Sequence, residues 1–508
     1  MQNKTAFLSG ILLLLLIAIP ASCSPLPGTP ASPIPTPTAS PIPTQSTETE
    51  VTPPPAITQT SSPTATLAPA MARAKYTLNM VMDYDAHTVV VDETILYPNH
   101  SGAVLNALVL AVEPNLWDGG FNLQSIAVDG APLTTFTLEG QKLNISLASA
   151  FQPETVLTIH VQYTLALPFA EQADPNISRP RIYGYTKRQL NLTNWYPFVV
   201  PNINGEWVLH EPGYFGEHLV YDAADFEVNL TFADPSAAVA VAASGSAEQL
   251  GASTRYTINA ARSFAMSASR DFHVASLMLG NVTVTSYYFD FYQVPGQSVL
   301  QASAEALQLY SQRFGAYPHQ TLSIVMGDFN DGMEYSGFFF MPLSAYNLFN
   351  GTRESLLTTV AVHETAHQWW FEQAGNDQAA QPWLDESLST YTEIIYYETY
   401  SPQSLAWWWQ YWPGRLQQNY TPQGGIDIQI YDGGSFVKYT GEVYLNGAHF
   451  LQDLRARIGD EAFFAFLQDY LIQENGRIAT SADFFRILRQ HTSADLSDLL
   501  SKYFKNSY

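Results

Sequence analysis

The stretch HETAHQWW, residues 363–370, decides how the rest of the chain is interpreted. It contains two histidines four residues apart, with a glutamate directly after the first. On an α-helix, residues i and i+4 lie on the same face, so His363 and His367 can both reach one Zn²⁺ ion at about 2.0 to 2.1 Å. Such a pair also arises by chance on solvated helices. A metal site therefore requires a third ligand elsewhere.

The stretch PWLDESLSTYTE, residues 382–393, supplies that ligand. Glu386 follows His367 after 18 intervening residues and lies on a second predicted helix. Glu393, two turns later on the same face, can hydrogen-bond a ligand histidine and fix its orientation. A hydrolytic zinc needs three protein ligands and an open position for water. The spacing predicts one Zn²⁺ per chain, held by His363, His367 and Glu386.

Several motifs around this site resemble the aminopeptidase N family, gluzincin metallopeptidases whose HExxH is followed after 18 residues by a ligand glutamate. HQWW and DESLS stand where the family has HQWF and NEGFA, DGMEYSG resembles GxMEN, FGAYP matches FG-x-YP, and VYLNG resembles YxKG. NWYPFVVP and GEWVLHEP resemble a bacterial branch. The resemblance covers most of 75–508 and is strongest in 310–475. The departures are Tyr335, Trp370, Asp385, Ser387, Leu388 and Asn446.

The resemblance implies a role for each remaining motif residue. Glu364 is expected to act as the general base on the zinc-bound water, and Tyr444 to donate to the developing oxyanion. Gly332, Met333 and Glu334 are expected to bind substrate, with the Glu334 carboxylate pairing with a free α-ammonium. The implied function is a zinc-dependent aminopeptidase that hydrolyses the N-terminal peptide bond of peptides.

Two alternatives remain open. A zinc endopeptidase on the same scaffold is favoured because the chain ends soon after the catalytic half, without the helical C-terminal domain of many relatives, which predicts an open cleft; Glu334 opposes it. A non-catalytic surface-binding protein with a relic zinc site is opposed by Glu364 and Tyr444 together with the three ligands. Tyr335, in place of Asn, leaves the alignment of the substrate open.

Hydrophobic periodicity predicts a multidomain fold. Alternating apolar residues predict strands in the segments YTLNMVMDY, TVVVDETILY, FNLQSIAVDG, KLNISL, TVLTIHVQY and FEVNLTF, which indicates an antiparallel β-sandwich or saddle domain over residues 71–270. Helical periodicity follows at 298–313, 354–374, 385–399, 441–457 and 460–473. Residues 271–508 are therefore expected to form a mostly helical α+β domain, which the resemblance makes thermolysin-like. The aromatic run AWWWQYWPG (406–414) favours core packing over a substrate cleft.

The N-terminal region predicts export. Residues 1–22 resemble a signal peptide, and Ala21-Ser22-Cys23 resembles the cleavage site of bacterial lipoproteins, so we expect a lipid on Cys23, the only cysteine. An ordinary signal peptide or an uncleaved anchor is the alternative. Residues 23–70, rich in Pro, Thr, Ser and Ala, are typical of an extended tether. The protein is expected to be extracytoplasmic and lipid-anchored to a bacterial membrane at the cell envelope.

Charge and composition narrow the possible partners. The chain has 46 acidic and 22 basic residues and a net charge of −24, which argues against binding to nucleic acid. With 46% hydrophobic residues, its 508 residues can build large cores. Peptide substrates, and a membrane through the lipid at Cys23, are the expected partners. The oligomeric state stays open.

Overall fold

The computed structural model describes residues 73–170, 182–416, 424–432 and 434–508, without the side chains of 411–416. The predicted signal peptide at 1–22, the lipid site at Cys23 and the tether at 23–70 lie outside the described residues. Pro69–Tyr508 form one compact unit. None of the helices in the described ranges has the length and apolar character needed to cross a bilayer.

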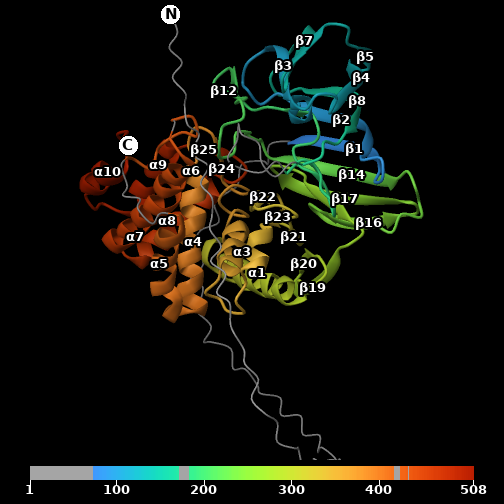
Figure 1. The fold of residues 1–508 in the computed structure, drawn as a ribbon. Coiled ribbons are helices and arrows are strands. Elements are labelled where there is room, and N and C mark those ends of the chain that lie inside the picture. The colour runs from blue at the N-terminus through green and yellow to red at the C-terminus, as the bar shows by residue number, and fades with distance from the viewer. Residues whose placement is uncertain (1–72, 171–181, 417–423, 433) are drawn as a thin grey trace, which may run out of the picture. The chain divides into compact units, whose positions relative to one another are not determined.

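The first half of this unit is built on an eight-stranded sheet (Figure 1). Its strand order is β16 (Ser246–Leu250), β17 (Ser253–Ala261), β14 (Ala224–Phe232), β1 (Ala74–Asp83), β2 (Thr88–Pro98), β8 (Val156–Ala166), β4 (Phe121–Val128) and β5 (Ala131–Pro132). In β2, Val89 and Val91 face the core while Val90 is half exposed. This alternation buries one face of the strand, as the period of two requires.

Smaller sheets cover the large one. One has the order β11 (Phe198–Val199), β3 (Leu105–Ala111), β7 (Lys142–Phe151) and β6 (Phe136–Glu139); another has β15 (Ala240–Ala243), β18 (Met266–Ser269), β10 (Leu190–Leu192) and β9 (Gly184–Tyr185). The hairpin of β12 (Asn202–Ile203) and β13 (Glu206–Trp207) and the short helix η1 (Glu113–Leu116) complete this half. The core contains inward residues of both layers, such as Leu108 and Ile159. The six segments predicted as strands are all confirmed, as β1, β2, β4, β7, β8 and β14.

One strand pair departs from the predicted antiparallel arrangement. β1 and β14 run parallel, from Ala74 opposite Ala224 to Met82 opposite Phe232. The chain leaves the large sheet after β8, builds parts of the smaller sheets, and then returns beside β1 in the same direction. A parallel pair needs such a long crossover rather than a hairpin. Local alternation predicts a strand but carries no information about the direction of its partner.

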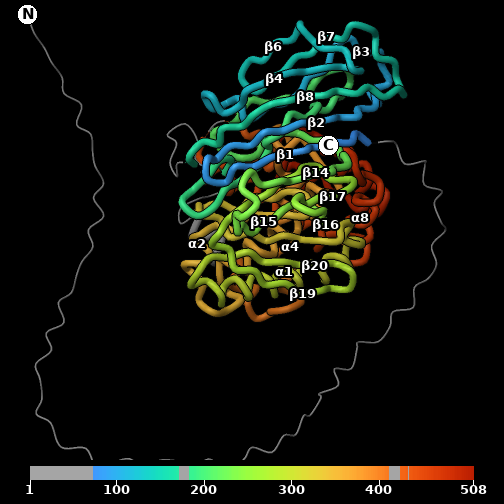
Figure 2. Tube along the Cα trace, turned by 90° about the vertical axis from the view of Figure 1, so that its right-hand side faces the viewer, coloured from blue at the N-terminus to red at the C-terminus, as the bar shows by residue number. Residues whose placement is uncertain are grey.

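The second half combines a five-stranded sheet with helices, and the helices labelled in Figure 2 lie below β1 and β2. The sheet has the order β19 (His273–Leu279), β20 (Val282–Tyr288), β21 (Thr321–Met326), β23 (Phe338–Met341) and β22 (Met333–Tyr335), and β24 (Gly375–Asn376) pairs with β25 (Ile478–Ala479). The helices are α1 (Gln293–Phe314), α2 (Leu343–Asn347), α3 (Leu356–Ala366), α4 (Trp383–Tyr400), η2 (Pro402–Ser404), α5 (Leu405–Leu416), α6 (Phe436–Tyr439), η3 (Thr440–Asn446), α7 (Gly447–Ile458), α8 (Asp460–Gln473), α9 (Ser481–His491) and α10 (Ser497–Tyr503). The helices α1 and α3 pack side by side against the sheet, and α4 packs against α3 and α7.

The helix predicted at 354–374 is shorter than expected. Ser355 caps its N-terminus, since the side chain accepts a hydrogen bond from the N–H of Thr358, but α3 ends at Ala366. Beyond it, the indole of Trp369 donates to the carbonyl of Gly315 and the indole of Trp370 donates to Thr392. Phe371 has a φ of 148°, which a regular helix cannot include. The prediction was wrong for 367–374 because periodicity does not register such tertiary contacts.

Candidate active site

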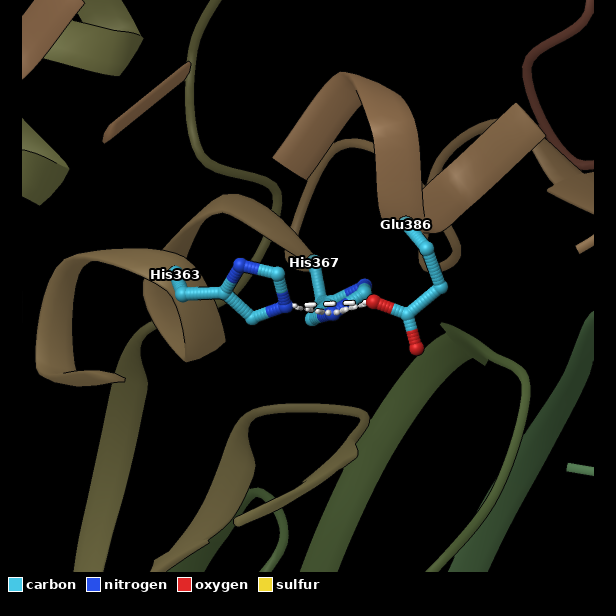
Figure 3. A group of neighbouring side chains, drawn as sticks. All are labelled: His363, His367 and Glu386. Carbon is cyan, nitrogen blue, oxygen red and sulfur yellow. Dashed lines mark hydrogen bonds and ion pairs between the residues drawn. The ribbon is translucent and has the colours of Figure 1, made fainter. Parts of the chain in front are cut away.

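The three predicted metal ligands converge inside the protein. His363 lies in the last turn of α3, His367 at its C-terminal end and Glu386 in the first turn of α4. The two Nε2 atoms are 3.1 Å apart, and Oε2 of Glu386 lies 3.2 Å from Nε2 of His363 and 3.6 Å from that of His367. In Figure 3 the three side chains point toward one another. All three are buried.

The donor atoms of this group fit a zinc ion. Nδ1 of His363 lies 2.8 Å from the carboxylate of Glu393, and Nδ1 of His367 lies 3.1 Å from the carbonyl of Trp370. With Nδ1–H donating in both rings, each Nε2 presents a lone pair toward Oε2 of Glu386. Tetrahedral ligands at about 2.0 to 2.1 Å from zinc would lie about 3.3 Å from one another. The observed separations match that spacing, and a cation satisfies all three lone pairs.

The charges of these groups are strongly coupled. Burial lowers the pKa of His363, but Glu386 and Glu393 raise it to about 10. Burial would raise the pKa of Glu386, yet the two histidines bring it below the ordinary value. The carboxylate is therefore stabilised by positive charge in this position, which a bound Zn²⁺ would provide.

Glu364 lies against the turn that carries Gly332. Its side chain is 5% exposed, and Oε2 has no hydrogen-bond partner among the described residues. A Cβ at Gly332 would lie 2.4 Å from Oε1 of Glu364, so any larger residue there would displace this carboxylate. Burial raises the pKa of Glu364 to about 8, although His363 and His367 oppose the shift. This carboxylate holds a proton more readily than one in water.

Tyr444 lies beside the ligands within η3, a wide helical turn of i to i+5 hydrogen bonds. The predicted helix at 441–457 is thus two elements, η3 and α7. The ring of Tyr444 stacks on that of His363, with centroids 5.9 Å apart and an angle of 13°. Its hydroxyl donates to Oε1 of Glu386. Such wide turns occur frequently at functional sites, and this one places a phenol next to the metal ligands.

Glu334 reaches the same place from β22. An oxygen of its carboxylate lies within 4.8 Å of donor atoms of Glu364 and His367. The side chain is 3% exposed, and Oε1 accepts a 2.9 Å hydrogen bond from Nε2 of Gln378. Burial raises the pKa of Glu334 to about 7, opposed by His367. The structure thus brings the predicted amine-binding carboxylate next to the predicted base.

A cavity of about 340 Å³ extends from Glu334 toward the β-rich half. Met333, Glu334 and Gln378 of the second half line it, together with Tyr183 and Tyr221 of the β-rich half. The predicted substrate residues Met333 and Glu334 therefore line a space that can hold a side chain or a short peptide. Gly332, the third predicted substrate residue, is not among the residues that line the cavity. Because it has no side chain, it leaves room for the carboxylate of Glu364.

Comparison with known proteins agrees with this geometry. Residues 299–503 match the Peptidase family M1 domain. This segment therefore carries the Peptidase family M1 domain. Zn²⁺ is accordingly its cofactor, and the aminopeptidase N-like resemblance of the sequence is confirmed.

Two curated relatives match part of the chain. Aminopeptidase N of Lactobacillus helveticus is 25% identical over 219 residues, which cover 41% of this chain and 26% of that protein. Human aminopeptidase O is 24% identical over 225 residues, which cover 38% of this chain and 27% of that protein. The chain thus spans about a quarter of the length of these relatives.

Solved structures match over most of the chain. A mutant M1 zinc metallopeptidase from Deinococcus radiodurans has a TM-score of 0.64 at 18% identity, over 86% of this chain and 95% of that one. The mutant bound to a Tyr-Ser-Ala substrate gives a TM-score of 0.63 over the same shares. This likeness establishes the fold: a multi-sheet β-rich half followed by a mostly helical catalytic half.

Two residues of the site were not identified from the sequence. Trp408 donates its indole N–H to Oε2 of Glu393 at 2.7 Å, which holds the carboxylate that orients His363. It is fully buried in the core, so the packing prediction for the aromatic run is confirmed at this position. Gln378 contacts Glu334, as described above. The run of tryptophans was a signal for Trp408, but no motif identified Gln378.

Proposed function

We propose that the protein is a zinc aminopeptidase that removes the N-terminal residue of peptides. The observation that carries the proposal is the position of Glu334, a buried carboxylate on the cavity wall next to Glu364 and His367. A fixed carboxylate at this distance can pair with a free α-ammonium and place only the first peptide bond at the metal ligands. The curated relatives, both named as aminopeptidases, support the same class of activity.

Each side chain has a separate task in this proposal. Zn²⁺ held by His363, His367 and Glu386 would act as a Lewis acid that polarises the scissile carbonyl and acidifies water. Glu364 takes the proton of the attacking water and passes it to the leaving amine. The hydroxyl of Tyr444, beside His363, donates to the carbonyl oxygen as negative charge develops on it.

The positioning contacts support this division of roles. Glu393 accepts from Nδ1 of His363 and keeps Nε2 of that ring directed at the metal position. The carbonyl of Trp370 has the same effect on His367. Burial of these groups excludes competing water and strengthens their electrostatic interactions.

One peptide in two forms tests the proposed function. The full-length protein is expected to shorten the peptide with a free N-terminus by one residue at a time, and to leave the N-acetylated form intact, as followed by mass spectrometry. Glu334→Ala is expected to lower kcat/KM for the free peptide by about tenfold to a hundredfold. Glu334→Gln, which keeps size and hydrogen bonding but removes the charge, should fall between. Internal cleavage of both forms, equally affected by Glu334→Ala, would indicate an endopeptidase instead.

We also propose that the enzyme acts at the cell envelope, anchored through a lipid on Cys23. The support is the apolar run at residues 6–19 followed by Ala21-Ser22-Cys23 and a Pro/Thr-rich tether. The wild-type protein should partition into the detergent phase, whereas Cys23→Ser should remain in the aqueous phase. Equal partitioning of the two proteins would refute the lipid anchor.

A further inference from the structure

Gln378 connects two buried carboxylates of the active site. Its Nε2 donates to Oε1 of Glu334 at 2.9 Å and to Oδ2 of Asp385 at 2.8 Å. Gln378 and Glu334 are each 3% exposed, and Asp385 is fully buried. A side-chain amide nitrogen carries two hydrogens. Both are therefore used, one on each carboxylate.

We propose that Gln378 is a positioning residue for the α-ammonium site, a role that rests on the proposed aminopeptidase function. By holding Oε1 of Glu334, it fixes the rotation of the carboxylate. Gln378 bonds Oε1, and the side chain lines the cavity. The other oxygen, Oε2, is the one that we assign to the N-terminus of the substrate.

The choice of a glutamine follows from charge. A lysine or arginine at this position could also orient the carboxylate of Glu334, but its positive charge would compensate the negative charge that attracts the substrate's ammonium. An amide donates hydrogen bonds and carries no net charge. Gln378 therefore orients Glu334 without weakening its attraction for a cation.

The same amide links amine recognition to the metal site. Oδ1 of Asp385 accepts a 2.7 Å hydrogen bond from the N–H of Glu386, the third predicted zinc ligand. Asp385 stands where the aminopeptidase N motif has an asparagine, and a carboxylate has no donor of its own when ionised. Nε2 of Gln378 is the donor to the carboxylate of Asp385. Glu334, Gln378, Asp385 and Glu386 thus form one hydrogen-bonded chain from the amine site to the metal.

The test compares a peptide that has a free N-terminal amine with its desamino analogue, in which hydrogen replaces the amino group. In the full-length protein, Gln378→Met keeps the length of the side chain but removes both donors. KM for the amine peptide should rise by about tenfold to a hundredfold, as expected for the loss of a hydrogen bond to a charged group, with a smaller change in kcat. The desamino peptide should be affected little, so the preference for the amine falls.

The control is Gln373→Met, the same substitution in the same loop. The amide of Gln373 makes one long hydrogen bond, 3.4 Å to the carbonyl of Gln368. This variant should keep the wild-type preference for the amine. Bound zinc and thermal unfolding are measured for both variants, which identifies any general damage to the site.

Gln378→Asn keeps the inference testable if Gln378→Met fails to fold. Its side chain is one methylene shorter and cannot span both carboxylates, so the preference for the amine should again fall. An unchanged preference in either folded, zinc-loaded variant overturns the role of Gln378. If the wild-type protein itself cleaves the amine and desamino peptides equally, the proposed aminopeptidase function fails instead, whatever the variants do.

Discussion

At the scale of single residues, the proposed role of Glu364 as the general base can be tested. Glu364→Gln keeps the size of the side chain and leaves the ligands in place, so zinc content and fold should be unchanged. Removal of the base should lower kcat by about 10² to 10⁴. Turnover is measured on the free peptide, and bound zinc by elemental analysis. Glu354→Gln, at the start of the α3 region, is the matched control with normal turnover. A Glu364→Gln enzyme as fast as wild type would contradict the mechanism.

Glu93 is a buried carboxyl group outside the active site. It lies in β2 with 0% exposure, and neither oxygen has a hydrogen-bond partner among the described residues. Burial raises the pKa of Glu93 well above its ordinary value. The folded state therefore binds this proton more tightly than the unfolded state does. The stability that the protonated group allows is present at low pH and is lost as pH rises above the unfolded pKa, about 4.3.

Glu93→Gln removes this titration. Relative to the variant, the wild-type protein should lose up to about 1.4 kcal/mol of unfolding free energy per pH unit above that pKa. Urea unfolding at pH 5 and pH 8 measures the difference. Asp92→Asn, on the other face of the same strand, is the control and should show no such loss toward high pH. Parallel pH profiles of wild type and Glu93→Gln would show that Glu93 is ionised in the folded state.

At the scale of elements, the close approach of α4 and α7 determines where Tyr444 lies. A Cβ at Gly447 would lie 2.0 Å from Oγ of Ser387, whose hydroxyl donates to the carbonyl of Val443 at 2.6 Å. Gly447→Ala should therefore displace η3 and α7, at a cost of about 1 to 3 kcal/mol for overpacking. Thermal unfolding should show the loss of stability.

The displacement should also lower kcat, because Tyr444 belongs to η3. Ser387→Gly combined with Gly447→Ala restores the space and should recover part of both losses. If Gly447→Ala were as stable and as active as wild type, α4 and α7 would not be in the tight contact that the structure shows.

Elements also show what local sequence can predict. The alternation in β2 and β8 identified strands correctly, because each buries one face along its whole length. The end of α3 and the wide turn η3 were not foreseen, since both depend on contacts with distant segments, such as Trp369 with Gly315. The same holds for the site. The spacing of His363, His367 and Glu386 reflects helical geometry and is visible in sequence, whereas Gln378 acquires its role only through a hydrogen bond to a strand 44 residues away.

At the scale of the whole molecule, Arg262 connects the two halves. It is 2% exposed, and its guanidinium group donates to carbonyl groups of Tyr221 in the β-rich half and of Glu372, Gln373 and Arg477 in the catalytic half. These bonds span 3.1 Å or less. A single buried cation thus satisfies four backbone acceptors at the junction.

Arg262→Met keeps most of the volume but removes the guanidinium donors. The carbonyl groups of Gln373 and Arg477 keep backbone hydrogen bonds from Gly476 and Gly375, so the loss falls mainly on those of Tyr221 and Glu372. A buried acceptor that loses its donor costs about 1 to 3 kcal/mol before the structure relaxes, so a total loss of about 2 kcal/mol or more is expected. Denaturant unfolding measures it. Arg255→Met, which removes a half-exposed arginine from β17, should cost less than about 1 kcal/mol. Equal stability of the two variants would mean that the junction does not depend on Arg262.

The parallel pairing of β1 with β14 also governs the order in which the protein can fold. β1 can pair with β2 as soon as the first hairpin forms, but its other edge stays open until the chain has reached Phe232. Contacts between segments so distant in the chain form slowly. An open strand edge in the meantime can pair with other chains. A fragment that stops after β8 would keep that edge permanently exposed, so aggregation is the expected fate of shortened versions of this protein.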